Sequence, residues 1–560
     1  MSPRRRVLSN ALIPGLLLIV TLAAPARAQF YDEARRSLDF SLDAIERSPR
    51  LVGMGRLTYV GDDPHTAITL WDFAANPLGI LQADSTNTAE LYPGTSSLSE
   101  MEDLAGTPAG VLEHQSGAAR ETRLAYEIWR RVAGRSAYGF AGDLGQLRRD
   151  QLYSGTVERR STLSQPTIMP VLTGRLPFVK TNRWLYSVRL FYSGERSVDQ
   201  YRGLAENAQG EYIDQNGPEV GPPEFFTPTE YTVRSMGGGF GLAYDLGRVQ
   251  SAVAFDAVEN KIKASSEGPR RASRTHENRS YTTGQWTVVA RPIGGISWGL
   301  DARGWRSHSI PGWDFSVSAG IGAEPLVGRG ELLDREEEGT ALRTRVRWTY
   351  GRFELGGGLS TGYRKITITP PDLGNFTSFN YFRDILIYRQ NADSLALPDS
   401  VSASETSERT WEAGAGLTMR LPGERGTWGV EFHRRRGITD RLLSDQVPGS
   451  SGATVLVPSF SGHGPLHRGW DVRTGLEYRC TPAMTGRLGY IYRWDDRDAY
   501  TEQNEYLGHS MTLGLGFKPA GATWTFDVGY AVAWQRADFG SPARVRENRQ
   551  QLVSLIRWAF

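Results

Sequence analysis

The amino-acid sequence predicts an all-β fold, a transmembrane antiparallel up-and-down β-barrel of about 16 strands within a range of about 14 to 18. Three observations predict it: an export signal at the N-terminus, segments in which apolar residues recur at every second position, and tight turns that alternate with long polar stretches. We divide the chain into residues 1–28, a signal peptide; residues 29–120, an N-terminal periplasmic or plug segment; and residues 121–560, the transmembrane barrel.

The N-terminus has the three parts of a secretory signal peptide. Arg4, Arg5 and Arg6 precede an apolar run from Ala11 to Ala24, and Ala26-Arg27-Ala28 forms a small-residue cleavage site. A membrane anchor is the alternative, but the apolar run is short and no cysteine stands there to accept a lipid. We therefore expect cleavage before Gln29 and export from the cytoplasm.

Composition limits the classes of protein that remain. Glycine (63 residues) and the aromatic residues are abundant although mean hydropathy is −0.40, and beyond the signal peptide the sequence holds no apolar run of the length a spanning helix needs. A formal charge of +2 argues against a nucleic-acid partner. The single cysteine, Cys480, excludes an intramolecular disulfide and a cysteine-rich metal site, and we expect neither a metal nor a cofactor.

Period-two alternation is the main pattern from about residue 121 onward. Glycine and polar or charged residues occupy the second face of these segments, where a soluble sandwich would place a second set of apolar residues. Aromatic residues gather near the segment ends, as in the interfacial girdles of membrane barrels. Clear examples are Trp524, Phe526, Val528, Tyr530, Val532 and Trp534, and Trp184, Tyr186, Val188, Leu190 and Tyr192.

Short and long connections alternate along the chain, which suggests tight periplasmic turns and extended outer loops. We expect outer loops at residues 195–229, 265–280, 309–338, 367–404 and 439–466. We expect tight turns near Pro177 to Asn182, Gly247-Arg248, Pro292 to Gly294, Gly351-Arg352, Pro422 to Gly426, Thr481 to Ala483 and Pro519 to Gly521.

Residues 29–120 differ from the rest of the chain. Leu38, Leu42 and Ile45 lie at helical spacing, which predicts a short amphipathic helix over residues 32–47. Residues 56–60 and 66–73 suggest brief strands, and residues 83–94 are polar and resemble a loop. Such a segment could plug the barrel or cap its periplasmic mouth.

The chain ends in a segment with one apolar face, formed by Leu552, Ile556, Trp558 and Phe560. This pattern resembles the C-terminal signature of outer-membrane barrel proteins. The resemblance implies that Trp558 and Phe560 belong to a signal that the barrel-assembly machinery recognises.

A second resemblance lies in the N-terminal segment. The sequence from Trp71 to Leu81 contains Asn76-Pro77-Leu78-Gly79, which resembles the Asn-Pro-Ala-Gly-Leu element of the long-chain fatty-acid transporter (FadL-like) family. Asn76, Pro77 and Gly79 match, whereas Leu78 replaces the alanine. The resemblance implies an N-terminal hatch, a plugged barrel and uptake of a small hydrophobic ligand; a plain turn is the alternative interpretation.

Charged residues are expected on the lumenal face of the strands. Arg343, Arg345 and Arg347 alternate with Leu342, Val346 and Trp348 and should point inward together. A ring of charge could select ions, or paired charges could fill the lumen; we favour the second interpretation because both signs occur. The other members of the set are Glu354, Glu431, Arg435, Arg473 and Glu477.

The leading hypothesis is an outer-membrane channel or transporter gated by its N-terminal plug. A non-transporting scaffold that binds partners is the alternative, and a barrel hydrolase is a third hypothesis. No triad-like motif stands out around His433, the best lumenal histidine, so we predict no enzyme and no catalytic residue. Expected partners are outer-membrane lipid, lipopolysaccharide and the barrel-assembly machinery.

Overall fold

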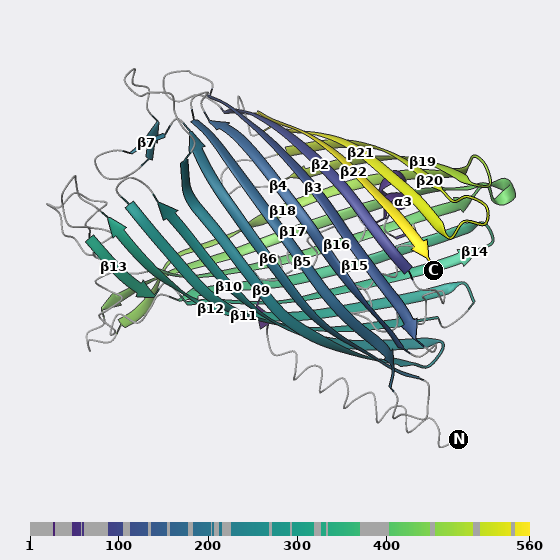
Figure 1. Cartoon of the computed structure of the whole chain (residues 1–560), viewed down its shortest axis with the longest axis horizontal. Coiled ribbons are helices and arrows are strands. Elements are labelled where there is room, and N and C mark those ends of the chain that lie inside the picture. Colours follow the sequence, from purple (N-terminus) through teal and green to yellow (C-terminus); the bar gives the residue numbers. More distant parts are fainter. Residues whose placement is uncertain are drawn as a thin grey trace.

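The structure is a computed structural model of the 560-residue chain. It describes residues 26–27, 48–57, 59–60, 88–104, 113–132, 136–153, 157–176, 183–202, 204–206, 212–214, 226–267, 271–291, 294–317, 326–331, 334–369, 402–448, 454–496, 505–538 and 544–560. Figure 1 shows these parts as one twisted cylinder of strands.

Antiparallel strands form a single sheet that closes on itself. Along the chain, successive strands of the ring pair with each other, and the first strand also pairs with the last. Eighteen strands of the described residues make the ring, at the upper limit of the expected range. They are β2 (Thr88–Leu104), β3 (Glu113–Val132), β4 (Ser136–Tyr153), β5 (Val157–Arg175), β6 (Trp184–Arg202), β9 (Phe226–Asp245), β10 (Val249–Glu267), β11 (Arg271–Ala290), β12 (Ile296–Val317), β14 (Asp334–Tyr350), β15 (Phe353–Thr369), β16 (Ser402–Arg420), β17 (Gly426–Pro448), β18 (Thr454–Arg479), β19 (Met484–Asp496), β20 (Glu505–Phe517), β21 (Trp524–Asp538) and β22 (Arg544–Ala559).

Several shorter elements accompany the ring. β7 (Leu204–Glu206) and β8 (Tyr212–Asp214) pair with each other, and β13 (Leu326–Glu331) pairs with residues 312–317 of β12, beyond the part that pairs with β14. β1 (Ala26–Arg27) lies in the expected signal peptide and pairs with residues 338–339 of β14. The one described α-helix, α3 (Pro49–Gly53), contacts β19 to β22. No helix among the described residues is long and apolar enough to cross a membrane.

The barrel begins earlier than the sequence analysis expected. The boundary at residue 121 is corrected to Thr88, because β2 pairs with β22 from Thr88↔Ala559 to Asp103↔Arg544 and with β3 on its other side. Residues 83–94 resemble a loop because they are polar, and β2 also contains Pro93 and Gly94, residues that usually interrupt strands. The ladder to β22 omits Pro93, so the missing N–H is tolerated there.

Tight turns gather at one end of the barrel. The first residue of β2, Thr88, and the last residue of β22, Ala559, lie at the same end. Gly247, Gly295, Gly351 and Gly521 have positive φ in these turns, a conformation that glycine adopts without a steric penalty. The 3-10 helix η1 (Pro422–Glu424) makes the turn between β16 and β17. The tight turn expected near Pro177 to Asn182 lies outside the described residues.

At the opposite end the strands run much further than predicted. β6 reaches Arg202, β12 reaches Val317 and β18 covers 26 residues, so large parts of the loops expected at 195–229, 265–280, 309–338 and 439–466 are strand. Most of residues 367–404 lies outside the described residues. The polar composition that suggested loops belongs to strand segments that extend past the apolar part of the barrel.

The apolar part is a belt on the outer face next to the tight turns. On β4 the exposed side chains Tyr138, Phe140 and Leu144 lie near its tight-turn end, and on β14 Val346, Trp348 and Tyr350 do the same. The belt covers roughly half of each strand, which is about the ten residues that a tilted strand needs to cross the hydrocarbon core. The barrel therefore has the outward pattern of an outer-membrane protein.

Candidate functional site

Residues 48–60 lie inside the barrel, and we call them the lumenal segment. Ser48 caps α3 by accepting a hydrogen bond from the backbone N–H of Leu51 at 3.0 Å, and Pro49 occupies the first helical turn. The described residues after Gly55, namely Arg56, Leu57, Tyr59 and Val60, belong to no strand, so the brief strand expected over residues 56–60 is wrong. Val52 and Leu57 are fully buried between the segment and the wall.

Glycines on the inner face of the wall make room for this segment. At most of them an added Cβ would lie within 3.0 Å of the lumenal segment, a separation that real Cβ atoms essentially never show. At Gly429, for example, it would lie 2.7 Å from Leu57 Cδ1. The row spans strands β15 to β21 and consists of Gly356, Gly358, Gly414, Gly416, Gly429, Gly475, Gly489, Gly514 and Gly529.

Side chains of the wall bind the backbone of the segment. Glu431 accepts hydrogen bonds from the N–H groups of Tyr59 at 2.5 Å and Val60 at 2.7 Å through one carboxylate oxygen. Thr512 accepts from the N–H of Gly55 at 3.0 Å and donates to the carbonyl of Gly53 at 3.1 Å. Since this stretch belongs to no ladder, these side chains satisfy polar groups that burial would otherwise leave unpaired.

Arginines bind the carbonyl oxygens of the same stretch. Arg473 donates to the carbonyl of Arg56 at 2.8 Å, and Arg345 donates to the carbonyl of Tyr59 at 2.8 Å. Arg347 approaches the same Tyr59 carbonyl at 3.3 Å. Four strands, β14, β17, β18 and β20, thus contact the segment backbone through side chains.

The helix is attached by an ion pair. Arg50 donates to both carboxylate oxygens of Glu477, at 2.7 and 2.9 Å, the paired geometry that gives arginine and carboxylate their strongest contact. Glu477 also accepts from Arg487 at 2.8 Å, and Arg487 donates to Asp527 at 2.6 Å. The charge on α3 is therefore neutralised by a network that reaches β18, β19 and β21.

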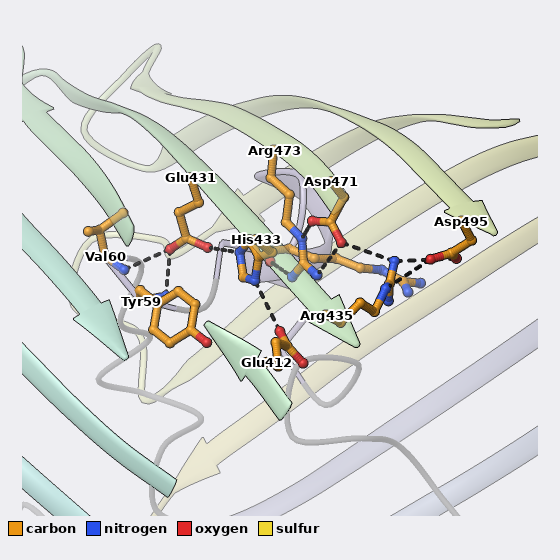
Figure 2. Close-up of polar contacts among 10 residues, drawn as sticks. Tyr59, Val60, Glu412, Glu431, His433, Arg435, Asp471, Arg473 and Asp495 are labelled. Atoms are coloured by element: carbon orange, nitrogen blue, oxygen red, sulfur yellow. Dashed lines mark hydrogen bonds and ion pairs between the residues drawn. The ribbon is translucent and has the colours of Figure 1, made fainter. Parts of the chain in front are cut away.

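Figure 2 shows His433 between two carboxylates beside the lumenal segment. Its Nδ1 lies 3.2 Å from Glu412 and its Nε2 lies 2.9 Å from Glu431. Two acceptors favour an imidazolium that donates from both nitrogens, which leaves no ring lone pair for a general base. Tyr59 packs against the ring at 4.9 Å, and burial, reinforced by Glu412, raises the pKa of Tyr59 to about 12.

A second charge cluster lies next to it in Figure 2. Asp471 accepts from Arg473 at 2.6 Å and from Arg435 at 3.3 Å, and Arg435 also donates to Asp495 at 3.1 Å. Alternating signs bring each buried charge next to an opposite one, which offsets the cost of its desolvation.

The charged residues named from the sequence take these positions. Arg345, Arg347, Glu431, Arg473 and Glu477 contact the lumenal segment directly, as described above. Arg347 also pairs with Glu354 at 3.0 Å, Arg343 acts electrostatically on Tyr59, and Arg435 contacts the aspartates. Their functional roles stay predictions.

Sequence reasoning missed Asp471, Asp495, Thr512 and the glycine row. The inward parity of the two aspartates and the threonine was available, but nothing marked them above other polar residues. The glycines were noticed only as small residues on the second face of the strands. Which of them meet a segment more than 290 residues earlier in the chain depends on packing that sequence spacing does not contain.

Other residues singled out in the sequence lie outside the described residues or away from the lumenal segment. Asn76, Pro77 and Gly79 lie outside the described residues, as do residues 32–47 and 66–73 and nearly all of residues 1–28. Trp558 on β22 and Phe560, which follows β22, are exposed beside the tight turns. Within the described part of the chain no cluster of histidine, cysteine and carboxylate residues fits a metal ion.

No protein-family model matches the chain, and no curated protein matches it in sequence. Solved structures that it resembles include a FadL homologue of Pseudomonas aeruginosa (10% identity, TM-score 0.38, 92% of this chain and 98% of that chain). The toluene transporter TodX of Pseudomonas putida has 10% identity, a TM-score of 0.38 and coverage of 93% and 99%. The ferric yersiniabactin uptake receptor FyuA of Yersinia pestis has 9% identity, a TM-score of 0.40 and coverage of 85% and 80%. At these values the likeness carries no argument about activity.

Replacing Gly489 by valine should loosen the lumenal segment, because the new side chain would overlap the backbone of Gly55 and Thr512 Oγ1. Overpacking of this kind costs about 1–3 kcal/mol, so amide exchange over residues 49–60 should accelerate about five- to hundredfold. Hydrogen exchange with mass spectrometry measures this directly.

The matched control is Gly299→Val on the inner face of β12, where the nearest atom to an added Cβ, the carbonyl oxygen of Val288, is 3.9 Å away. That variant should exchange like the wild type. Equal acceleration in both variants, or none in Gly489→Val, would contradict the proposed packing.

Proposed function

We propose that the protein is an outer-membrane transport channel whose lumen is plugged near the tight turns by the lumenal segment. The observation that carries the proposal is the attachment of residues 48–60 to the inner faces of β14 to β21 by side-chain hydrogen bonds, ion pairs and close glycine contacts. The segment lies against the inner face of the barrel wall and is not one of its strands. We infer that the segment obstructs a solute at this level of the lumen.

The segment is held in a way that permits movement. Residues 48–60 take part in none of the ladders of the sheet, so displacing them breaks no ladder. A five-residue helix such as α3 is not stable alone, so it would lose its structure once released from the wall. The free-energy cost of opening is therefore limited to the contacts described above.

Placement in the outer membrane is supported by independent features of the chain. The expected signal peptide over residues 1–28 directs export, and Trp558 and Phe560 fit the expected assembly signal. With the tight turns in the periplasm, the plug enters from the periplasmic side and the long strands project outward. The domain proposal becomes a signal peptide over residues 1–28, a plug over residues 29–87 and a barrel from Thr88 onward.

The finer proposal is that the transported compounds are hydrophobic. It is supported by the resemblance of Asn76-Pro77-Leu78-Gly79 to the hatch element of the FadL-like family and by the apolar side chains Val52, Met54 and Leu57 in the segment. Displacing these side chains from the wall would expose an apolar surface to a solute.

A non-transporting scaffold is the second candidate, and one observation favours it. The ion pairs of Arg435 with Asp471 and Asp495 and of Arg364 with Glu337 and Glu408 fill the inner face with paired charge. A lumen closed by such pairs would conduct poorly whether or not residues 48–60 were in place.

Conductance in planar bilayers separates the two candidates. Replacing residues 48–60 by a flexible Gly/Ser sequence of equal length, which leaves β2 intact, should raise single-channel conductance several-fold above that of the wild type. The Gly299→Val variant, which leaves the segment in place, should conduct like the wild type. Unchanged conductance after the replacement would contradict the plug proposal and favour the scaffold.

The substrate class is tested by mass spectrometry of small molecules that co-purify with the protein in detergent. A hydrophobic transporter should retain apolar compounds, and Asn76→Ala/Pro77→Ala should reduce their amount if the hatch element contributes to binding. If the replacement variant conducts but the wild type retains only polar solutes, the channel proposal stands and the hydrophobic one is rejected.

A further inference from the structure

The outer face of the barrel changes character abruptly on β9, β10 and β11, which lie side by side (Figure 1). On β9 the outward residues Phe240 and Met236 are strongly exposed and apolar, and the next outward residue is Arg234. On β10 the outward sequence passes from Phe255 through Ala257 to Glu259, Lys261 and Lys263. The change marks the upper edge of the apolar belt.

Basic side chains gather directly above that edge. Arg234 lies opposite Lys261, and Lys263 lies opposite His276, so their side chains are cross-strand neighbours about 5 Å apart at Cβ. Arg274, two residues before His276 in the chain, lies on the same face of β11. We call these five exposed residues the basic patch: Arg234, Lys261, Lys263, Arg274 and His276.

Few carboxylates balance this charge. Glu259 lies 4.0 Å from Lys261 at the limit of an ion pair, and Glu230 pairs with Arg196 at 2.8 Å on the side towards β6. Asp314 stands opposite Arg274 in the β11–β12 ladder. The positive excess of the described outward positions therefore rests on Arg234, Lys261 and Lys263. The chain has few lysines, yet Lys261 and Lys263 stand two residues apart here.

Surface ion pairing alone does not explain such an arrangement, because like charges directly opposite each other destabilise a sheet. Arg234 and Lys261 form such a like-charged pair. An anion that binds between them would remove the repulsion, and arginine and lysine are the side chains that most often bind phosphate groups.

We propose that the basic patch binds the phosphorylated headgroup of lipopolysaccharide in the outer leaflet. The patch lies where the hydrocarbon core ends on the outer side, the depth at which lipid phosphates sit. Below it, the stacked rings of Phe240 and Phe255, 5.8 Å apart, and the exposed Met236 offer an apolar surface for the acyl chains. One lipid molecule can therefore meet both surfaces at once.

This inference is independent of conduction through the lumen, and it requires only that the long-strand end faces the cell exterior. A soluble anion would have no use for the apolar surface below the patch. Lipid phosphates in the inner leaflet would face the tight turns at the other end of the barrel.

The test measures lipopolysaccharide bound to the full-length protein extracted from outer membranes in mild detergent, by native mass spectrometry. In Lys261→Gln/Lys263→Gln, retention should fall about twenty-fivefold, since each basic side chain near an anionic lipid surface contributes about a fivefold gain in binding. Arg425→Gln/Lys518→Gln, which removes the same charge at the tight turns, should retain lipid like the wild type.

A second measurement keeps the outcome clear. Purified lipopolysaccharide should raise the melting temperature of the delipidated wild type more than dephosphorylated lipopolysaccharide does. The melting temperature of Lys261→Gln/Lys263→Gln should rise by the same amount with either form. Equal retention by the patch variant and the wild type, or equal stabilisation by both lipid forms, would overturn the proposal. Stabilisation by inorganic phosphate alone to the same extent would also overturn it, because the acyl surface would then play no part.

Discussion

Closure of the sheet between β2 and β22 is the constraint on which the rest of the structure depends. In hydrocarbon each unpaired backbone N–H or C=O costs several kcal/mol, so a strand-built membrane protein needs a sheet without edges. The pairing of Thr88 to Asp103 with Arg544 to Ala559 removes the only two edges that the linear order of strands would leave. It also brings the N-terminal part of the chain beside its C-terminus, so that residues 48–60 are released into the lumen near the tight turns and beside β21 and β22.

Once the ring is closed, strand parity assigns every side chain to lipid or to lumen, and the two faces acquire different chemistry. Inside, glycines bring the wall close to the lumenal segment, while Glu431, Arg473 and Thr512 bind its backbone. Outside, the apolar belt ends at a level where the basic patch begins. The proposed plug site and the proposed lipid site thus depend on the same alternation, although they lie on opposite faces of the wall.

The sequence predicted what period-two alternation can encode and missed what depends on the packing of distant segments. Inward placement of Arg345 and Glu431 follows from parity alone, because their neighbours Val346 and Phe432 are apolar and face outward. β2 was missed because Pro93 and Gly94 interrupt a weak pattern, and tertiary pairing with β22 overrides that local preference. The outer strand extensions were taken for loops because strands beyond the lipid no longer need an apolar face. The match of Gly489 to Gly55 is invisible in sequence, since it depends on where a separate segment folds back.

Cysteine crosslinking across the closing strands tests the central claim most directly. In a Cys480→Ser background, Ser97→Cys and Gln550→Cys stand directly opposite each other on exposed positions of β2 and β22. The account predicts that they form a disulfide in the membrane and that the linked protein keeps its folded mobility in unheated SDS gels. Arg120→Cys with Gln550→Cys should not crosslink, because β2 separates β3 from β22 and two strand spacings exceed the reach of a disulfide. Crosslinking of the second pair in preference to the first would mean that the ring closes without β2, and would contradict the account.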